Sequence, residues 1–227
     1  IGQRGFSPSA LATWLSCPLD LYFKYVLGIR SPEEVDEKLG SDVLGQAVHR
    51  VMELIFEPFI DRAIDPQELR ANIQAIEKML IGHLSARFPL EALRSGHFRL
   101  RMEMAAKALA AYLTAEADRC NRSTTIQRSL EIEVSAKLPN GMLIRGRCDR
   151  IDERDGIIHI LDVKTGSVQN TQVEFKALDR DQITPEKRYG LQLLMYAWAY
   201  MMQEPTVRKV RAGIIPLQKA SQAGGLL

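Results

Sequence analysis

Hydrophobic positions in the first half of the chain recur at the spacing of amphipathic helices. The segment Ser7-Pro8-Ser9 supplies a helix start, and Gly28 supplies a helix stop. Asp65-Pro66 is a second start signal, with the proline in the first turn. We therefore predict helices over residues 10–26, 41–60, 65–88 and 90–121. The charged stretch 31–38 is expected to form a loop.

The pattern changes near Ser123, where apolar and polar residues begin to alternate as in a half-buried strand. Turn signals at Pro139-Asn140-Gly141 and Asp155-Gly156 divide this region into two tight hairpins, which indicate an antiparallel meander. A polar stretch follows at 165–184. We predict strands over residues 126–138, 142–151, 157–164 and 207–215, and a helix over residues 185–203.

This division predicts an α/β (α+β-like) fold, in which a helical N-terminal half packs on a small mixed β-sheet core. We expect a single domain with a helical part, a sheet core and a weak tail at residues 1–122, 123–216 and 217–227. The chain has 227 residues and does not begin with methionine, so we expect a fragment of a longer protein. A composition of 46% hydrophobic and 26% charged residues excludes a disordered or collagen-like chain.

Composition also bears on the cellular setting. No apolar run reaches the ~18–20 residues that a membrane helix needs, so we expect no membrane partner. Cys17, Cys120 and Cys148 are too few and too widely spaced for a disulfide framework, and no pair has the CxxC spacing of a zinc site. These features favour a reducing, cytoplasmic setting. The net charge of +2 leaves nucleic-acid binding open, because charge can be segregated locally.

The residues with the clearest chemical potential are Asp149, Asp162 and Lys164. Asp162 and Lys164 are two apart on one predicted strand and share a face, and Asp149 lies on the neighbouring strand. Polar groups in an apolar strand are expensive to bury without partners. Two carboxylates suit a hard cation such as Mg²⁺ that also binds phosphate oxygens. The alternative is structural: an Asp162–Lys164 ion pair at a sheet edge, with Asp149 capping a turn.

These residues belong to motifs whose order and spacing resemble a known family. Residues 146–152 read G-R-C-D-R-I-D, and residues 160–166 read I-L-D-V-K-T-G. A G-x-x-x-H motif precedes them at 45–49, and a Q-x-x-x-Y motif follows at 192–196. Together with the opening segment 7–29, they resemble the PD-(D/E)XK nuclease superfamily, in particular its RecB/AddB-type exonuclease domain. The resemblance implies a sheet core of the restriction-endonuclease-like type.

The resemblance implies a role for each matching position. The implied ligands of Mg²⁺ or Mn²⁺ are His49, Asp149, Asp162 and the Val163 backbone carbonyl. Lys164 is the implied catalytic lysine. Gln192 and Tyr196 are expected to line the site and to contact DNA or orient Lys164. Without the resemblance, the simplest interpretation of His49 is a structural helix histidine, and that of Gln192 and Tyr196 is an ordinary core pair.

Further charged residues lie near these motifs. Glu131 and Glu133 are additional candidate ligands, although we expect both to be exposed to solvent. Lys187 and Arg188 are candidate substrate-binding residues, because basic side chains can follow a DNA backbone. The second strand offers further candidates for that role in Arg145, Arg147 and Arg150. Acidic residues are interleaved among them, so a solvated surface of mixed charge is the alternative.

An iron–sulfur cluster occurs in some AddB-type nucleases, with one cysteine before the core and three after it. Cys17 matches the first position, but the three downstream cysteines are absent from this sequence. Such clusters normally take four cysteines, so no iron–sulfur cluster is expected in this chain. Cys120 and Cys148 are interpreted as small buried residues.

The residues and the resemblance together indicate a metal-dependent deoxyribonuclease, expected to be an exonuclease in recombinational repair or DNA end processing. The expected partners are DNA and a helicase subunit or fused helicase-like region, because the chain has no G-x-x-x-x-G-K-[ST] motif of its own. The alternative is a non-catalytic nucleic-acid-binding or docking module of a helicase–nuclease complex. A decayed site should have lost some of the motif residues, whereas all of them are present.

Overall fold

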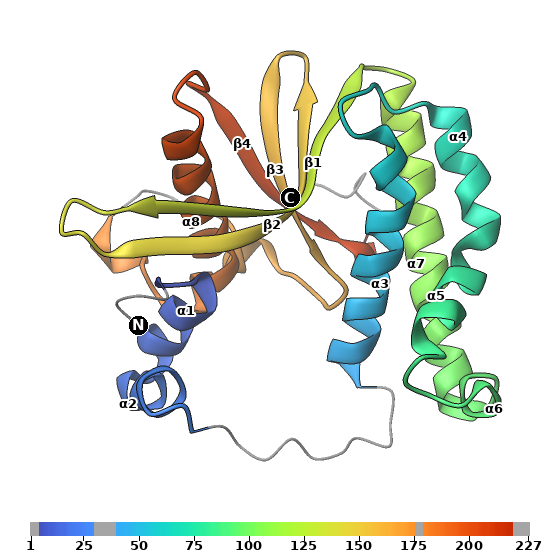
Figure 1. The fold of residues 1–227 in the computed structure, drawn as a ribbon, viewed down its shortest axis with the longest axis horizontal. Coiled ribbons are helices and arrows are strands. Elements are labelled where there is room, and N and C mark those ends of the chain that lie inside the picture. Colours follow the sequence, from blue (N-terminus) through green and yellow to red (C-terminus); the bar gives the residue numbers. More distant parts are fainter. Residues whose placement is uncertain (1–4, 30–39, 176–178, 220–227) are drawn as a thin grey trace.

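The computed structural model describes residues 5–29, 40–175 and 179–219. Figure 1 shows a twisted sheet with helix α8 on one side and a group of several helices on the other. Helix α8 spans Arg188–Gln203, and the opposite group comprises α3 (Ser41–Phe56), α4 (Pro66–Ala71), α5 (Ile76–Leu84) and α7 (Gly96–Cys120). The predicted helical half on a small mixed sheet is confirmed. The predicted loop 31–38 and residues 220–227 of the predicted tail lie outside the described residues.

The sheet contains the strands β1 (Thr125–Lys137), β2 (Leu143–Arg154), β3 (Ile157–Lys164) and β4 (Val210–Pro216), in that order across the sheet. The first three are antiparallel neighbours, and β4 runs parallel to β3. Asp155 and Gly156 have φ values of 50° and 74°, the left-handed geometry of a two-residue hairpin turn. The predicted meander is therefore confirmed, with β2 running past its predicted end at 151.

Apolar side chains cover both faces of β3. On one face, Leu161 and Val163 belong to the core that α3 and α7 build. On the other face, Ile160 packs in a second core with Cys148 and with Tyr196 of α8. This double cover accounts for the nearly continuous apolar sequence of the strand. It also means that a polar residue on β3 is held in a buried and well-defined position.

The first predicted helix, 10–26, is wrong as a single element. The chain instead forms α1 (Pro8–Ser16), α2 (Pro18–Leu21) and a π-helical turn (Tyr22–Val26). Pro18 disfavours a helical conformation at the preceding residue, and Cys17 is extended, with φ of −158°. The start is as predicted, because the Ser7 hydroxyl accepts a hydrogen bond from the Ala10 N–H at 3.2 Å.

Tighter turns interrupt the other predicted helices. Pro58 has no N–H to donate and interrupts the α-helical pattern after Phe56. Single-turn 3-10 segments lie at Glu57–Phe59, Asn72–Ala75 and Pro185–Lys187, and a short helix, α6 (Leu90–Leu93), precedes α7. The predicted start at Asp65 is confirmed, because its carboxylate accepts a hydrogen bond from the Gln67 N–H at 2.8 Å. None of the described helices combines the length and the apolar composition that crossing a membrane requires.

A buried charge network fastens α7 to β2. Arg150 is 1% exposed and donates hydrogen bonds to Asp152 at 2.7 Å, Tyr112 at 2.8 Å and Glu116 at 2.5 Å. Its guanidinium also lies 4.0 Å from the ring centroid of Phe56 in α3. The prediction that Arg150 is available to a DNA backbone is therefore wrong, because this side chain points into the core between the sheet and the helices.

Candidate active site

Strands β2 and β3 bring Asp149, Asp162 and Lys164 together. The antiparallel register of the two strands sets Asp149 beside Asp162. Asp149 Oδ2 accepts a hydrogen bond from the Val163 N–H at 2.6 Å, and Lys164 Nζ lies 2.5 Å from Asp162 Oδ2. The pair of carboxylates with an adjacent lysine, expected from the strand periodicity, is therefore present as a group of neighbouring side chains.

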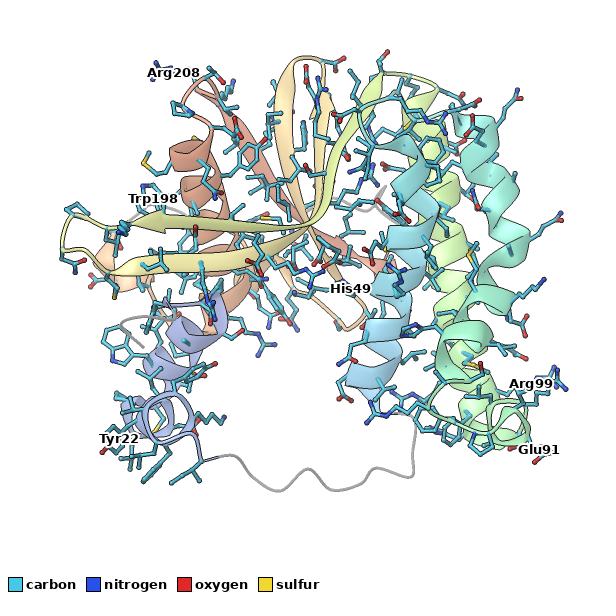
Figure 2. The ribbon with its side chains drawn as sticks, in the orientation of Figure 1. Tyr22, His49, Glu91, Arg99, Trp198 and Arg208 are labelled. Carbon is cyan, nitrogen blue, oxygen red and sulfur yellow. The ribbon has the colours of Figure 1, made fainter. Side chains whose placement is uncertain are left out.

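Helix α3 adds His49 to this group, and Figure 2 shows His49 projecting from α3 toward the sheet. His49 Nδ1 lies 3.6 Å from Asp149 Oδ1 and 3.7 Å from Glu131 Oε1. The potential ligand atoms of these three residues all lie within 4.8 Å of one another. A Cβ at Gly45, one turn before His49, would lie 3.3 Å from Thr165 Oγ1, so glycine allows α3 to approach the end of β3 closely.

Glu131 lies in this group although its sequence context favoured solvent exposure. Its side chain is only 17% exposed, and its φ of 49° departs from extended strand geometry. Arg147 holds it in place: Arg147 Nε lies 2.8 Å from Glu131 Oε2 and donates to the Glu131 carbonyl at 3.1 Å. The expectation of exposure is wrong for Glu131 and correct for Glu133. The deciding feature is the backbone at Glu131, which residue spacing does not reveal.

Helix α8 contributes Gln192 and Tyr196 from one face. Gln192 Nε2 donates hydrogen bonds to Asp162 Oδ1 at 2.7 Å and to Tyr196 Oη at 2.8 Å. The Tyr196 ring lies against Gly146, and any side chain at that position would collide with the ring. Asp162 Oδ2 is buried and has no hydrogen-bond partner among the described residues, apart from its ion contact with Lys164.

Burial and like charge shift the protonation of this group. Desolvation, followed by the charge of Asp162, raises the pKa of Asp149 to about 7. Burial also raises the pKa of Asp162, although Lys164 acts in the opposite direction. Burial lowers the pKa of His49, but its contact with the Glu131 carboxylate and the charge of Asp149 outweigh burial, so the net pKa shift is upward. The charges near Asp149 and Asp162 therefore do not offset the effect of burial on the pKa of either carboxyl.

The donor atoms fit a divalent cation. Carboxylate oxygens suit Mg²⁺ and Mn²⁺, and one imidazole nitrogen suits Mn²⁺ as well. The buried Asp162 Oδ2 contacts only the Lys164 ammonium among the described residues, so a lone pair stays available to a cation. The Val163 N–H donates to Asp149, and this contact does not involve the Val163 carbonyl. The role of that carbonyl as a metal ligand stays a prediction.

Lys187 and Arg188 lie outside this group. Lys187 Nζ donates to the Glu174 carbonyl and lies 5.6 Å from the Phe175 ring centroid, so it fastens the loop before α8. Arg188 is exposed and stacks on Tyr189 at 4.7 Å, and the other neighbour of that ring is Lys164 Nζ at 5.5 Å. Their role in substrate binding stays a prediction, with Arg188 the better placed of the two.

The fold and this group of side chains agree with one class of protein. The family model of the PD-(D/E)XK nuclease superfamily matches residues 5–225, and the chain belongs to that superfamily. Similar proteins include one subunit of the ATP-dependent helicase/deoxyribonuclease from two strains of Streptococcus equi subsp. zooepidemicus, H70 and MGCS10565. They are 30% and 29% identical to this chain over 168 residues. Each match covers 71% of this chain but only 14% of the relative, and the predicted RecB/AddB-type resemblance is confirmed.

Proposed function

We propose that this chain is a metal-dependent deoxyribonuclease, with His49, Asp149 and Asp162 holding Mg²⁺ or Mn²⁺ and Lys164 as the catalytic lysine. One observation carries the proposal. Lys164 Nζ contacts the buried Asp162 carboxylate beside a group of acids and one imidazole whose donor atoms lie within 4.8 Å. That arrangement places positive charge next to a cation site, where a phosphodiester would need it.

Each side chain has a distinct task in this proposal. A divalent cation at the site supplies Lewis acidity toward a phosphate oxygen and water. The Lys164 ammonium stabilises the negative charge that develops on the phosphate and orients the attacking water. Gln192 fixes the Asp162 carboxylate by a hydrogen bond, and Tyr196 accepts a second hydrogen bond that fixes Gln192. The low exposure of these groups strengthens every one of these interactions.

The proposal extends to exonuclease action in recombinational repair or DNA end processing, at a cytoplasmic location. It is supported by the two relatives, which are described as helicase/deoxyribonuclease subunits. The chain spans only 14% of their length, so a helicase subunit or fused helicase-like region belongs to the proposal as a partner. A non-catalytic nucleic-acid-binding or docking module is the competing function, and it would have no need of Lys164 beside the acids.

The test is degradation of end-labelled linear DNA, single- and double-stranded, with Mg²⁺ or Mn²⁺ and with EDTA. Wild-type protein is expected to shorten the DNA only with metal, and Lys164→Ala is expected to cut at least about 100-fold more slowly. Lys137→Ala, an exposed lysine at the end of β1, is the matched control and should cut like the wild type. Metal-dependent cutting at the wild-type rate in Lys164→Ala would overturn the assignment, and binding of DNA without cutting by the wild type would favour the non-catalytic module.

A further inference from the structure

An open groove of about 460 Å³ adjoins the candidate active site. His49 and Glu131 line the groove, so it opens directly onto the donor atoms described above. Helix α3 contributes Gln46 and Arg50 to its lining, and strand β2 contributes Arg147. A substrate strand whose backbone reaches the donor atoms can therefore continue along this groove.

The two arginines of the groove come from opposite sides and are both held by carboxylates. Arg50 Nη1 lies 2.6 Å from Glu53 Oε2 on the same helix. Arg147 is held through Nε alone, by the side chain and the carbonyl of Glu131. Among the described residues, the two terminal nitrogens of Arg147 donate no hydrogen bond. A guanidinium fixed in this way presents its remaining N–H groups in the fork that matches a phosphate.

The charge of the groove depends on a cation. Glu53 and Glu131 are each matched by an arginine, which leaves the exposed Asp42 as an unmatched acid in the lining. The unloaded groove is therefore not attractive to a polyanion, and a divalent cation beside His49 would make the groove less negative. The arginines then act on a phosphate only in combination with the metal, which couples substrate affinity to metal loading.

We propose that Arg147 and Arg50 bind the phosphodiester next to the one that is cleaved, so that the groove between α3 and β2 carries the DNA backbone away from the active site. This inference rests on the proposed nuclease function and adds the path of the substrate. Arg147 has a second task as a positioning residue, because the same side chain holds Glu131 in the group of donor atoms.

The experiment measures binding of a fluorescent single-stranded oligonucleotide by anisotropy, in the Lys164→Ala background with Ca²⁺ or EDTA at several salt concentrations. Arg50→Ala and Arg147→Ala are expected to weaken binding with Ca²⁺, and each should reduce the slope of log K against log [salt] by roughly 0.7–1. The matched controls are Arg99→Ala, a helical arginine paired with Glu103, and Arg128→Ala, a cross-strand arginine paired with Glu153. Both controls should bind like the parent.

A chemical change in the DNA tests the same contact from the other side. A single neutral methylphosphonate next to the scissile position should weaken binding by the parent protein. It should weaken binding less in Arg147→Ala, where the contact is already lost. Cleavage kinetics add a further readout, because loss of a phosphate contact raises KM, whereas misplacement of Glu131 lowers kcat. Arg147→Lys keeps the charge but not the forked pair of N–H groups. Its affinity for DNA should therefore lie between those of the parent protein and Arg147→Ala.

The outcomes separate this inference from the proposed function. If the wild type cuts DNA and both arginine variants bind and cut like their matched controls, the groove is not the substrate path and this inference is overturned alone. If the wild type neither cuts nor binds DNA with metal, the proposed function fails and this inference fails with it. Selective weakening in the two groove variants, together with a smaller methylphosphonate effect in Arg147→Ala than in the parent protein, supports it.

Discussion

Two clusters of buried charge lie on adjacent residues of β2 and differ in how their charges are balanced. Asp149 and Arg150 point to opposite faces of the strand. On the helical side, Arg150 lies among Asp152, Glu116 and Tyr112, and each acid contacts at least one guanidinium. On the other side, Asp149 lies among acids and one imidazole, with Lys164 as the nearest ammonium. Each acid of the first cluster therefore contacts a guanidinium, whereas Asp149 in the second contacts the His49 imidazole and a backbone N–H.

The carboxyl pKa values express this difference. Burial alone would raise the pKa of Glu116, but Arg150 and Arg119 outweigh it and bring the pKa down to about 2. The same desolvation, reinforced by Asp162, raises the pKa of Asp149 to about 7. Similar burial therefore has opposite outcomes, and the sign depends on whether arginines are present. A buried acid without arginine partners is therefore a candidate ligand for a cation taken up from solution.

The largest expected effect comes from breaking the balanced cluster. Arg150→Ala leaves Glu116 and Asp152 buried with fewer cationic partners and should lower the free energy of unfolding by about 3–5 kcal/mol. Urea unfolding monitored by circular dichroism measures the change. Arg128→Ala, which removes an exposed pair with Glu153, is the control and should cost less than about 1 kcal/mol. Similar losses of unfolding free energy in the two variants would show that the buried network stabilises the fold no more than an exposed ion pair does.

The next effect concerns the unbalanced cluster and falls on activity. Lys164→Ala should lower kcat by a factor on the order of 10²–10³, because in the proposed function it removes the charge that stabilises the reacting phosphate. Its free energy of unfolding should fall in the absence of metal, because the buried Asp162 loses the ammonium that contacts it, but by less than in Arg150→Ala, since Lys164 itself is partly exposed. Initial rates on end-labelled DNA measure kcat, with Lys137→Ala as control. If Lys164→Ala lost activity only because the protein was unfolded under the assay conditions, the contrast between the two clusters would be contradicted.

Asp149→Asn should stabilise the metal-free protein at high pH. Because folding raises the pKa of Asp149 from 3.8 to about 7, its contribution to stability is complete below about pH 4 and is lost as the pH rises through about 7. The variant should therefore exceed the wild type by about 1–3 kcal/mol at about pH 8 and not at about pH 4. Urea unfolding in EDTA at both pH values measures this difference.

The control for this pH dependence is Glu133→Gln, an exposed acid on β1. It should leave the pH profile of stability unchanged. If the wild type and Asp149→Asn lose stability in parallel between pH 4 and pH 8, ionisation of the buried Asp149 carboxyl does not cause the loss.

The smallest effect is expected at the edge of the site. Tyr196→Phe removes the hydroxyl that accepts a hydrogen bond from Gln192, which is worth about 0.5–1.5 kcal/mol. This should lower kcat by about 2- to 10-fold with little change in KM, because Gln192 then orients Asp162 less firmly. Tyr200→Phe, one helical turn further along α8, is the matched control. Equal rates in the two variants would show that Tyr196 does not help to orient Asp162 through Gln192.

The fold follows from the sequence where local rules decide. The turns at Pro139-Asn140-Gly141 and Asp155-Gly156 divide the sheet correctly, because left-handed turn residues and strand alternation are local properties. The long helices were predicted without their interruptions, since hydrophobic periodicity continues through Pro18 and Pro58 while the hydrogen bonds do not. In both cases the proline was the available signal.

The residues of the candidate site were likewise predictable only where local rules decide. Strand periodicity and one hairpin are enough to place Asp149 beside Asp162 and Lys164. His49 needed the family resemblance, because a position on a helix does not say which strands that helix meets. Arg150 and Glu131 reversed their expected environments for non-local reasons: one is buried by the packing of α7, and the other is turned inward by its own backbone φ.

Calorimetric titration of Mn²⁺ into metal-free protein at about pH 8 asks most directly whether the unbalanced cluster is a cation site. We predict saturable binding by the wild type and by Glu133→Gln. Binding should be at least about tenfold weaker in Asp149→Ala and in Asp162→Asn, since each loses a charged ligand. Unchanged Mn²⁺ binding in both site variants, or no binding by the wild type, would contradict the assignment of this cluster as a cation site.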